Sequence, residues 1–185
     1  MKRLLFKTLG LILVISAMGC VPSLHQLYTE ETLTFDEALI GTWSDDDSTW
    51  KFEKESEKQY KLTMTDGEGK IGKFETHLVQ IGDHRYLDLY PLEPDLSEND
   101  FYKGHLIPSH TFMQLRQIEP HLQLSPMGPG AIENLLEENP SAVKHEVVQN
   151  SIVLTAQPEQ LQAFIKKYHA YEDLFGEADD MDRVQ

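Results

Sequence analysis

Through the middle of this chain, apolar and polar residues alternate with a period of two. In Trp50-Lys51-Phe52 and in Tyr60-Lys61-Leu62-Thr63-Met64, every second side chain is apolar. Because successive side chains of a strand point to opposite faces of a sheet, this period predicts strands with one buried face. Asp66-Gly67-Glu68-Gly69 follows, and its glycines supply the positive φ that a tight hairpin turn requires. The alternation therefore favours antiparallel strands joined by short turns.

The later part of the chain carries the same signal together with two helical segments. Strands are predicted at 70–81, 85–90, 101–107, 111–118, 122–124 and 145–156. The apolar phase of the first of these flips at His77-Leu78-Val79, which predicts a bulge or a bend. Helical spacing appears from Pro129 to Glu138 and from Pro158 to Phe175, and each segment has proline in its first turn.

Strands with one apolar face must close into a barrel or stack as a sandwich to hide that face and their edges. The predicted fold class is mainly β with two helices. We expect a single antiparallel barrel or meander of about eight strands, with one helix before the last strand and another at the C-terminus. This single β-rich domain is predicted to span residues 34–176, followed by an acidic, disordered tail at 177–185.

Cys20, the only cysteine, follows a basic start, an apolar run from Leu9 to Ile15 and a small residue, Gly19. This order defines a secretory signal peptide, here residues 1–19. The apolar run is well short of the roughly 20 residues that span a bilayer. A cysteine directly after the cleavage point makes the leader resemble that of bacterial lipoproteins of the cell envelope, in which a diacylglycerol is attached to the sulfur.

That resemblance implies that Cys20 is lipidated, that the membrane is a partner through this lipid, and that residues 20–33 form a lipidated tether. Val21 follows the cysteine where a retained inner-membrane lipoprotein has aspartate. The resemblance therefore favours the periplasmic leaflet of the outer membrane in a Gram-negative cell, and otherwise the outer face of the cell membrane.

Charge and cysteine content exclude several classes of function. Without the leader, the chain has 13 basic residues (16 minus three) against 31 acidic ones, a net charge near −18. Such a surface repels polyanions, so nucleic acid is excluded as a partner. With its one cysteine lipidated, the domain can form no internal disulfide, and its stability must come from packing.

Gly41-Thr42-Trp43 follows a short predicted helical turn and leads into the first strand. This step resembles the Gly-x-Trp that opens the lipocalin-like (calycin) barrels, where the tryptophan closes the barrel floor and a C-terminal helix packs outside. The predicted last strand, 145–156, contains no arginine that could stack on Trp43. The resemblance implies a barrel that can hold a small apolar ligand.

Other motifs do not fit the chemistry that they suggest. Gly67-Glu68-Gly69-Lys70-Ile71-Gly72 matches a dinucleotide fingerprint, but it lies between two predicted strands rather than before a helix. The eight histidines form no cluster with the spacing of metal ligands. Ser109 and His110 are neighbours in a predicted strand and so point to opposite faces. We therefore expect no catalytic residues, no metal and no cofactor, and no enzymatic activity.

Two functions stay open. The aromatic and apolar alternates are either the packed core or the wall of a pocket for a small or lipidic ligand; they are Trp50, Phe52, Tyr60, Leu62 and Met64. The leading hypothesis is a membrane-anchored, non-enzymatic domain that binds such a ligand. The alternative is a structural or protein-interaction lipoprotein with a packed interior and an envelope protein as partner.

Overall fold

The computed structural model describes residues 20–92, 99–171 and 174–184. Its strands are β1 (Leu33–Thr34), β2 (Gly41–Ser44), β3 (Ser48–Lys54), β4 (Tyr60–Asp66), β5 (Ile71–Ile81), β6 (His84–Pro91), β7 (Thr111–Gln117), β8 (His121–Pro126), β9 (His145–Val148), β10 (Ser151–Leu154) and β11 (Asp179–Arg183). Its helices are the 3-10 turn η1 (Glu37–Leu39), α1 (Asp100–Lys103), α2 (Pro129–Glu138) and α3 (Pro158–Tyr168).

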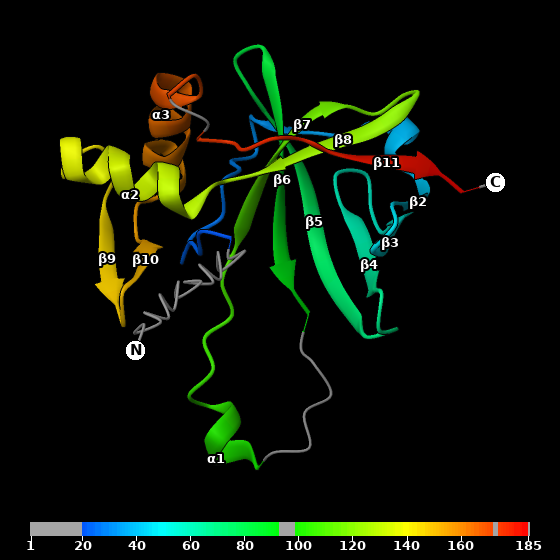
Figure 1. Ribbon diagram of the computed structural model, residues 1–185, viewed down its shortest axis with the longest axis horizontal. Coiled ribbons are helices and arrows are strands. Elements are labelled where there is room, and N and C mark those ends of the chain that lie inside the picture. The colour runs from blue at the N-terminus through cyan, green and yellow to red at the C-terminus, as the bar shows by residue number, and fades with distance from the viewer. Residues whose placement is uncertain (1–19, 93–98, 172–173, 185) are drawn as a thin grey trace, which may run out of the picture.

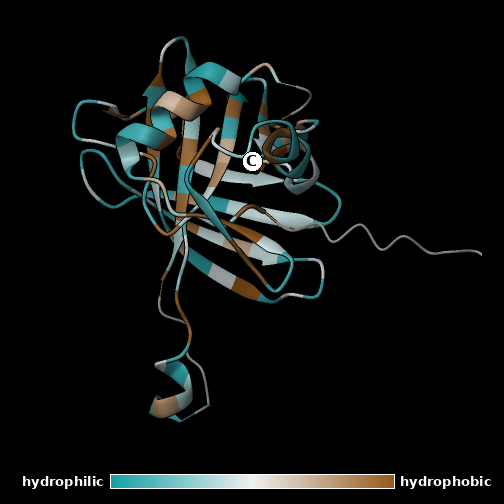
Figure 2. Cartoon of the chain, turned by 90° about the vertical axis from the view of Figure 1, so that its left-hand side faces the viewer, coloured by the Kyte–Doolittle hydropathy of each residue, from teal (hydrophilic) through white to brown (hydrophobic). Residues whose placement is uncertain are grey.

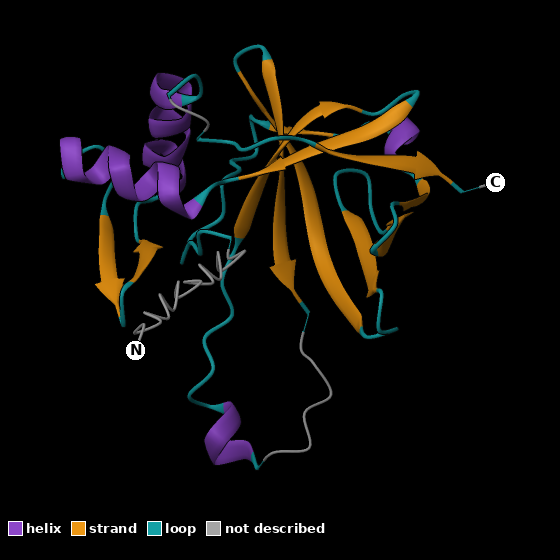
Figure 3. Cartoon of the chain, in the orientation of Figure 1, coloured by secondary structure: helices purple, strands orange, loops and turns teal. Residues whose placement is uncertain are grey.

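Eight strands close into an antiparallel barrel. Consecutive strands pair from β2 to β8, and β11 then pairs with both β8 and β2 to complete the ring. The short strand β1 adds to the edge of β5 beyond the point where β4 ends. The predicted fold class is confirmed, and the barrel is compatible with the lipocalin-like fold. Figure 3 shows the barrel on one side of the molecule and the helices α2 and α3 on the other.

Two apolar layers explain the apparent phase flip in β5. Leu78 points into the barrel, whereas Val79 points outward and packs under the helical layer. Both faces are covered at this point, so successive residues are apolar although the strand is regular. The pairing of β5 with β6 runs without interruption from Phe74 to Ile81. The predicted bulge at His77-Leu78-Val79 was therefore wrong.

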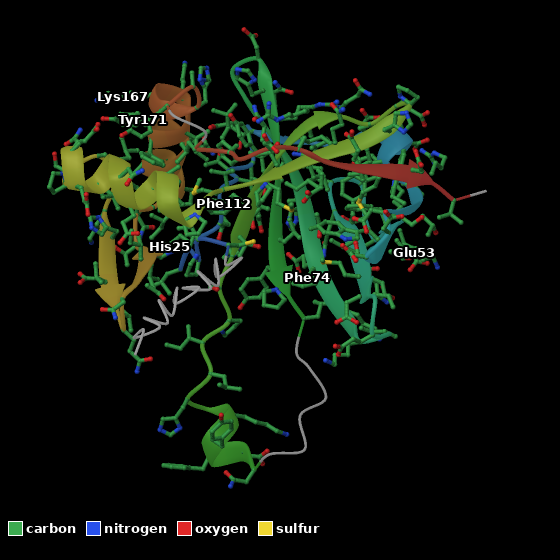
Figure 4. All side chains as sticks on the ribbon, in the orientation of Figure 1. His25, Glu53, Phe74, Phe112, Lys167 and Tyr171 are labelled. Atoms are coloured by element: carbon green, nitrogen blue, oxygen red, sulfur yellow. The ribbon has the colours of Figure 1, made fainter. Side chains whose placement is uncertain are left out.

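The predicted strand 145–156 is a hairpin outside the barrel. β9 and β10 form a two-stranded sheet, and the turn between them places Gln149 and Asn150 at positive φ. On the other side of β10, Leu154 forms a parallel bridge with Ser23. Together with α2, α3 and residues 21–32, the hairpin covers the outer face of β5, β6 and β7. Figure 4 shows Phe112, an outward residue of β7, on the side of the barrel that faces these elements.

The predicted tether at 20–33 was wrong beyond its first residue. Val21 and Leu27 are fully or almost fully buried in the layer between the barrel and the helices. Ser23 exchanges backbone hydrogen bonds with His110, at 2.9 and 2.8 Å. Isolated apolar residues in a polar context carry no periodic signal, which is why the sequence suggested a linker. Within the described residues, packing is present from Val21 onward.

The predicted disordered tail contains the strand that closes the barrel. Met181 is buried between β2 and β8, and the pairs Asp182↔Ser44 and Arg183↔Trp43 join β11 to the first barrel strand. Asp179-Asp180-Met181-Asp182-Arg183 has a single apolar residue, so no alternation marks it as a strand. Its one inward side chain is enough because both neighbouring strands supply backbone partners.

Candidate functional site

The barrel interior, where a ligand would bind, is filled with side chains. One cluster of apolar residues from η1 and the eight barrel strands occupies it. Of the five predicted pocket residues, Phe52, Tyr60 and Leu62 are buried with almost no accessible surface, and Trp50 is buried at the edge of the cluster. A void that admits a water molecule would give its lining atoms accessible surface. No ligand-sized space therefore adjoins Phe52, Tyr60 or Leu62.

Met64, the fifth predicted residue, pairs with Trp50 across β3 and β4 and is only partly buried, at the rim of the cluster. It lines a shallow, open cavity of about 270 Å³ together with Phe74 and residues of the β4–β5 turn. Figure 4 labels Phe74 near this end of the barrel. The cavity lies below the range of roughly 300–1,000 Å³ typical of small-molecule sites. Thr76, a buried interior residue, has a hydroxyl without a hydrogen-bond partner, yet no accessible space adjoins it.

The other end of the barrel is closed by Trp43 and Arg183. The guanidinium of Arg183 lies over the Trp43 ring, 4.2 Å from its centroid, and donates to the carbonyl oxygens of Ile40 and Ala38. Trp43 itself donates through Nε1 to the carbonyl oxygen of Leu39 at 3.0 Å. An arginine does stack on the tryptophan, but it comes from β11 rather than from 145–156. Arg183 is present in the sequence, but no alternation of apolar and polar residues marks 179–183 as a strand.

Cys20 is exposed at the start of the folded body. It lines an open cavity of about 340 Å³ with Val21, Pro22 and residues of α2 and β10. Burial of the next residue, Val21, leaves no flexible linker between this sulfur and the fold. A group attached to the Cys20 sulfur would therefore lie directly beside the folded domain.

A buried carboxylate fixes the segment that follows Cys20. Asp88 of β6 is 1% exposed; its Oδ2 accepts the backbone N–H of Leu27 at 2.6 Å, and its Oδ1 lies 2.7 Å from His110 Nδ1. The ring of His110 packs against Tyr90, with centroids 4.6 Å apart. The two carboxylate oxygens of Asp88 thus join β6 to Leu27 and to His110. In the sequence, the alternation of the strand places Tyr86, Asp88 and Tyr90 on one face. The two aromatic residues on this face indicate that another part of the chain covers it.

A second histidine lies on the same outer face. The His77 ring packs on Tyr28, with centroids 4.2 Å apart, and burial lowers the pKa of His77. Burial, helped by Asp88 and Glu75, raises the pKa of Tyr28 to about 12. Both rings are therefore neutral near pH 7 and act as packing groups under the N-terminal segment.

One edge of the β9–β10 hairpin is unpaired within the described sheets. The Thr155 N–H donates to the Lys144 carbonyl oxygen at 2.9 Å, which marks those two residues as a hydrogen-bonded pair. Alternation along an antiparallel ladder then directs the backbone groups of His145 and Val147 away from β10. This free edge can accept an extended segment of another protein by strand addition.

The predicted strand 101–107 is instead part of a projecting loop between β6 and β7. We call residues 99–110 the arm; its single turn α1 stands away from the barrel (Figures 1 and 2), and His110 at its base contacts Asp88 of β6. The arm carries four exposed large apolar side chains: Phe101, Tyr102, Leu106 and Ile107. The predicted strand was wrong, because no strand of the described sheets pairs with residues 101–107.

Neither metal ligands nor a membrane-spanning helix is found in the described part of the chain. Across 20–92, 99–171 and 174–184, no group of three or more His, Cys, Asp or Glu residues could hold a metal ion. Over the same ranges, no helix has the length and apolarity needed to cross a bilayer. Comparisons with protein-family models, curated proteins and solved structures find no match.

Proposed function

We propose that this protein is a lipid-anchored, non-enzymatic protein of the bacterial cell envelope that works through its outer surface, with a packed barrel as its scaffold. The observation that carries the proposal is the filled interior around Phe52, Tyr60 and Leu62. The free edge of β9 supports contact with another protein. The leader before Cys20 and its resemblance to lipoprotein signals support the anchor, with the outer membrane favoured in a Gram-negative cell.

Binding of a small apolar ligand is a second candidate because of one observation. The rim cavity of about 270 Å³ beside Met64 and Phe74 is lined mainly by apolar surface and opens to solvent. A ligand there would cover the rim rather than enter the barrel. Both candidates leave Phe52 packed in the interior, and they differ because only the second gives Met64 a binding role.

Phe52→Ala should lower the free energy of unfolding by about 3–5 kcal/mol, the cost of emptying a packed aromatic site. Met64→Ala, at the half-buried rim, should cost about 1 kcal/mol or less and serves as the matched control. Chemical denaturation of both variants measures the difference. A Phe52→Ala protein as stable as the parent would mean that this side chain lines a void, and the packed scaffold would be rejected in favour of a ligand site.

A further inference from the structure

The outer edge of β9 carries exposed apolar side chains and backbone groups without a partner strand. Val147 is 63% exposed and Val148 is 54% exposed. The backbone groups of His145 and Val147 point away from β10, and no other strand of the described sheets pairs with them. The pairing of β9 with β10 is regular, without a bulge, and β9 contains no proline. Such an edge is a template for a further strand.

The charges around this edge differ from those of the chain as a whole. Between the end of α2 at Glu138 and the start of α3 at Pro158, the only Asp, Glu, Lys or Arg residues are Lys144 and Glu146, one of each sign. The whole chain, in contrast, has a formal net charge of −15. Repulsion between the more distant acidic surfaces of two copies is screened over about 10 Å at 0.1 M salt. Two copies of the hairpin therefore meet through a locally balanced surface.

One antiparallel register of two β9 strands pairs these charges twice. When His145 lies opposite His145 of a second copy, Lys144 of each chain lies opposite Glu146 of the other. These two pairs are of the non-hydrogen-bonded kind, because the outward backbone groups belong to His145 and Val147. Side chains in such pairs are close, with Cβ atoms about 4.5–5.5 Å apart, and opposite charges there are stabilising.

The neighbouring registers lose this complementarity. A displacement of two residues in one direction places two Glu146 carboxylates directly opposite each other, and in the other direction two Lys144 ammonium groups, and both arrangements are destabilising. In the favoured register, Val147 of each copy reaches past the start of the other β9. An open cavity of about 420 Å³, lined by residues 140–145 and Gln160, lies at that point. The surface is thus hollowed where the hairpin of the second copy extends.

We propose that the edge of β9 is a dimer interface, to which a second copy of this chain adds its own β9 in antiparallel orientation, centred on His145. The proposal rests on the surface role proposed above and names the partner, and it does not require the lipid. The two hairpins form one four-stranded sheet in the order β10–β9–β9–β10. A two-fold axis relates the two barrels, so one contact covers the free edge of both copies.

Sedimentation equilibrium of the purified full chain in a non-ionic detergent tests the charge pairing. We expect a monomer–dimer equilibrium that Glu146→Lys weakens by at least about tenfold, since two pairs of opposite charges become pairs of like charges. Glu146→Lys combined with Lys144→Glu exchanges the two signs and should restore the dimer. Glu53→Lys is the matched control: it makes the same charge change on β3, on the opposite side of the molecule from β9 (Figures 1 and 4), and should leave the dimer unchanged. A parent chain that sediments only as a monomer, or equal effects of Glu146→Lys and Glu53→Lys, would overturn the proposal.

Single cysteine substitutions test the register in membranes that contain the protein. His145→Cys should form a disulfide between two copies under mild oxidation, since residues of a hydrogen-bonded pair lie about 5.5 Å apart at Cα, within the range of a disulfide. Val147→Cys should not, because Val147 of the second copy lies four residues away along the ladder. A disulfide from Val147→Cys or Glu146→Cys, with none from His145→Cys, would contradict the pairing centred on His145.

The parent chain separates the dimer from the proposed anchor, because Cys20 is its only cysteine. A Cys20 that reacts with a maleimide carries no lipid, so the anchor fails, while sedimentation still decides whether the dimer forms. An unreactive Cys20 in a chain that stays monomeric keeps the anchor and rejects the dimer.

Discussion

Asp88→Ala should lower the free energy of unfolding by about 3–5 kcal/mol, because it breaks a buried pair and leaves its partners without an acceptor. The Leu27 N–H and the His110 ring both lose the carboxylate that they contact at 2.6 and 2.7 Å. Chemical denaturation monitored by fluorescence measures the loss. Hydrogen exchange should show that residues 21–32 lose protection first, since Asp88 is what joins them to β6.

The chain contains its own control for this prediction. Asp182 and His121 form the same kind of pair, at 2.6 Å between Oδ1 and Nδ1, but their side chains are 79% and 53% exposed. Asp182→Ala should therefore cost only about 0–1 kcal/mol, as exposed ion pairs do. Equal effects of the two substitutions would contradict the role assigned to burial at Asp88.

A chain that ends at Ala178 should lose at least about 4 kcal/mol of stability, a large share of the 5–15 kcal/mol typical of a domain. The truncation removes β11, and with it the buried Met181 and the stacking of Arg183 on Trp43. It also leaves the facing edges of β2 and β8 unpaired, because β11 lies between them. Thermal unfolding should become broad or shift to a much lower midpoint.

The control is a chain that ends at Val184, which retains the whole of β11 and the Val184 N–H donated to the Thr42 carbonyl oxygen. It should unfold like the parent. If the chain ending at Ala178 also unfolds like the parent, residues 179–183 are dispensable, and they are the disordered tail that their composition suggests.

How far the sequence predicts this fold depends on how each strand is covered. β3 and β4 have one face in the barrel core and the other in water, so their alternation is visible in the sequence. β5 is covered on both faces from Thr76 to Val79, and its alternation disappears although the strand is regular. β11 contributes one buried side chain and gives no periodic signal at all.

The candidate site was predictable only where it depends on local sequence. The proposed leader and the proposed lipid site at Cys20 rest on adjacent residues alone. Asp88 and Leu27 are 61 positions apart, and no local pattern relates them. The arm was predicted as a strand because Phe101 to Ile107 is rich in apolar and aromatic residues, a composition typical of strands, whereas it forms one helical turn with exposed apolar side chains.

The proposed anchor is a lipid on Cys20, attached directly to the fold without a linker. Mass spectrometry of the N-terminal peptide, from protein purified out of membranes, tests this claim. We predict a mature chain that begins at Cys20 and carries the mass of a diacylglycerol, and a Cys20→Ala variant that lacks this mass. A chain that still begins at Met1, or a Cys20 with a free thiol, would contradict the account.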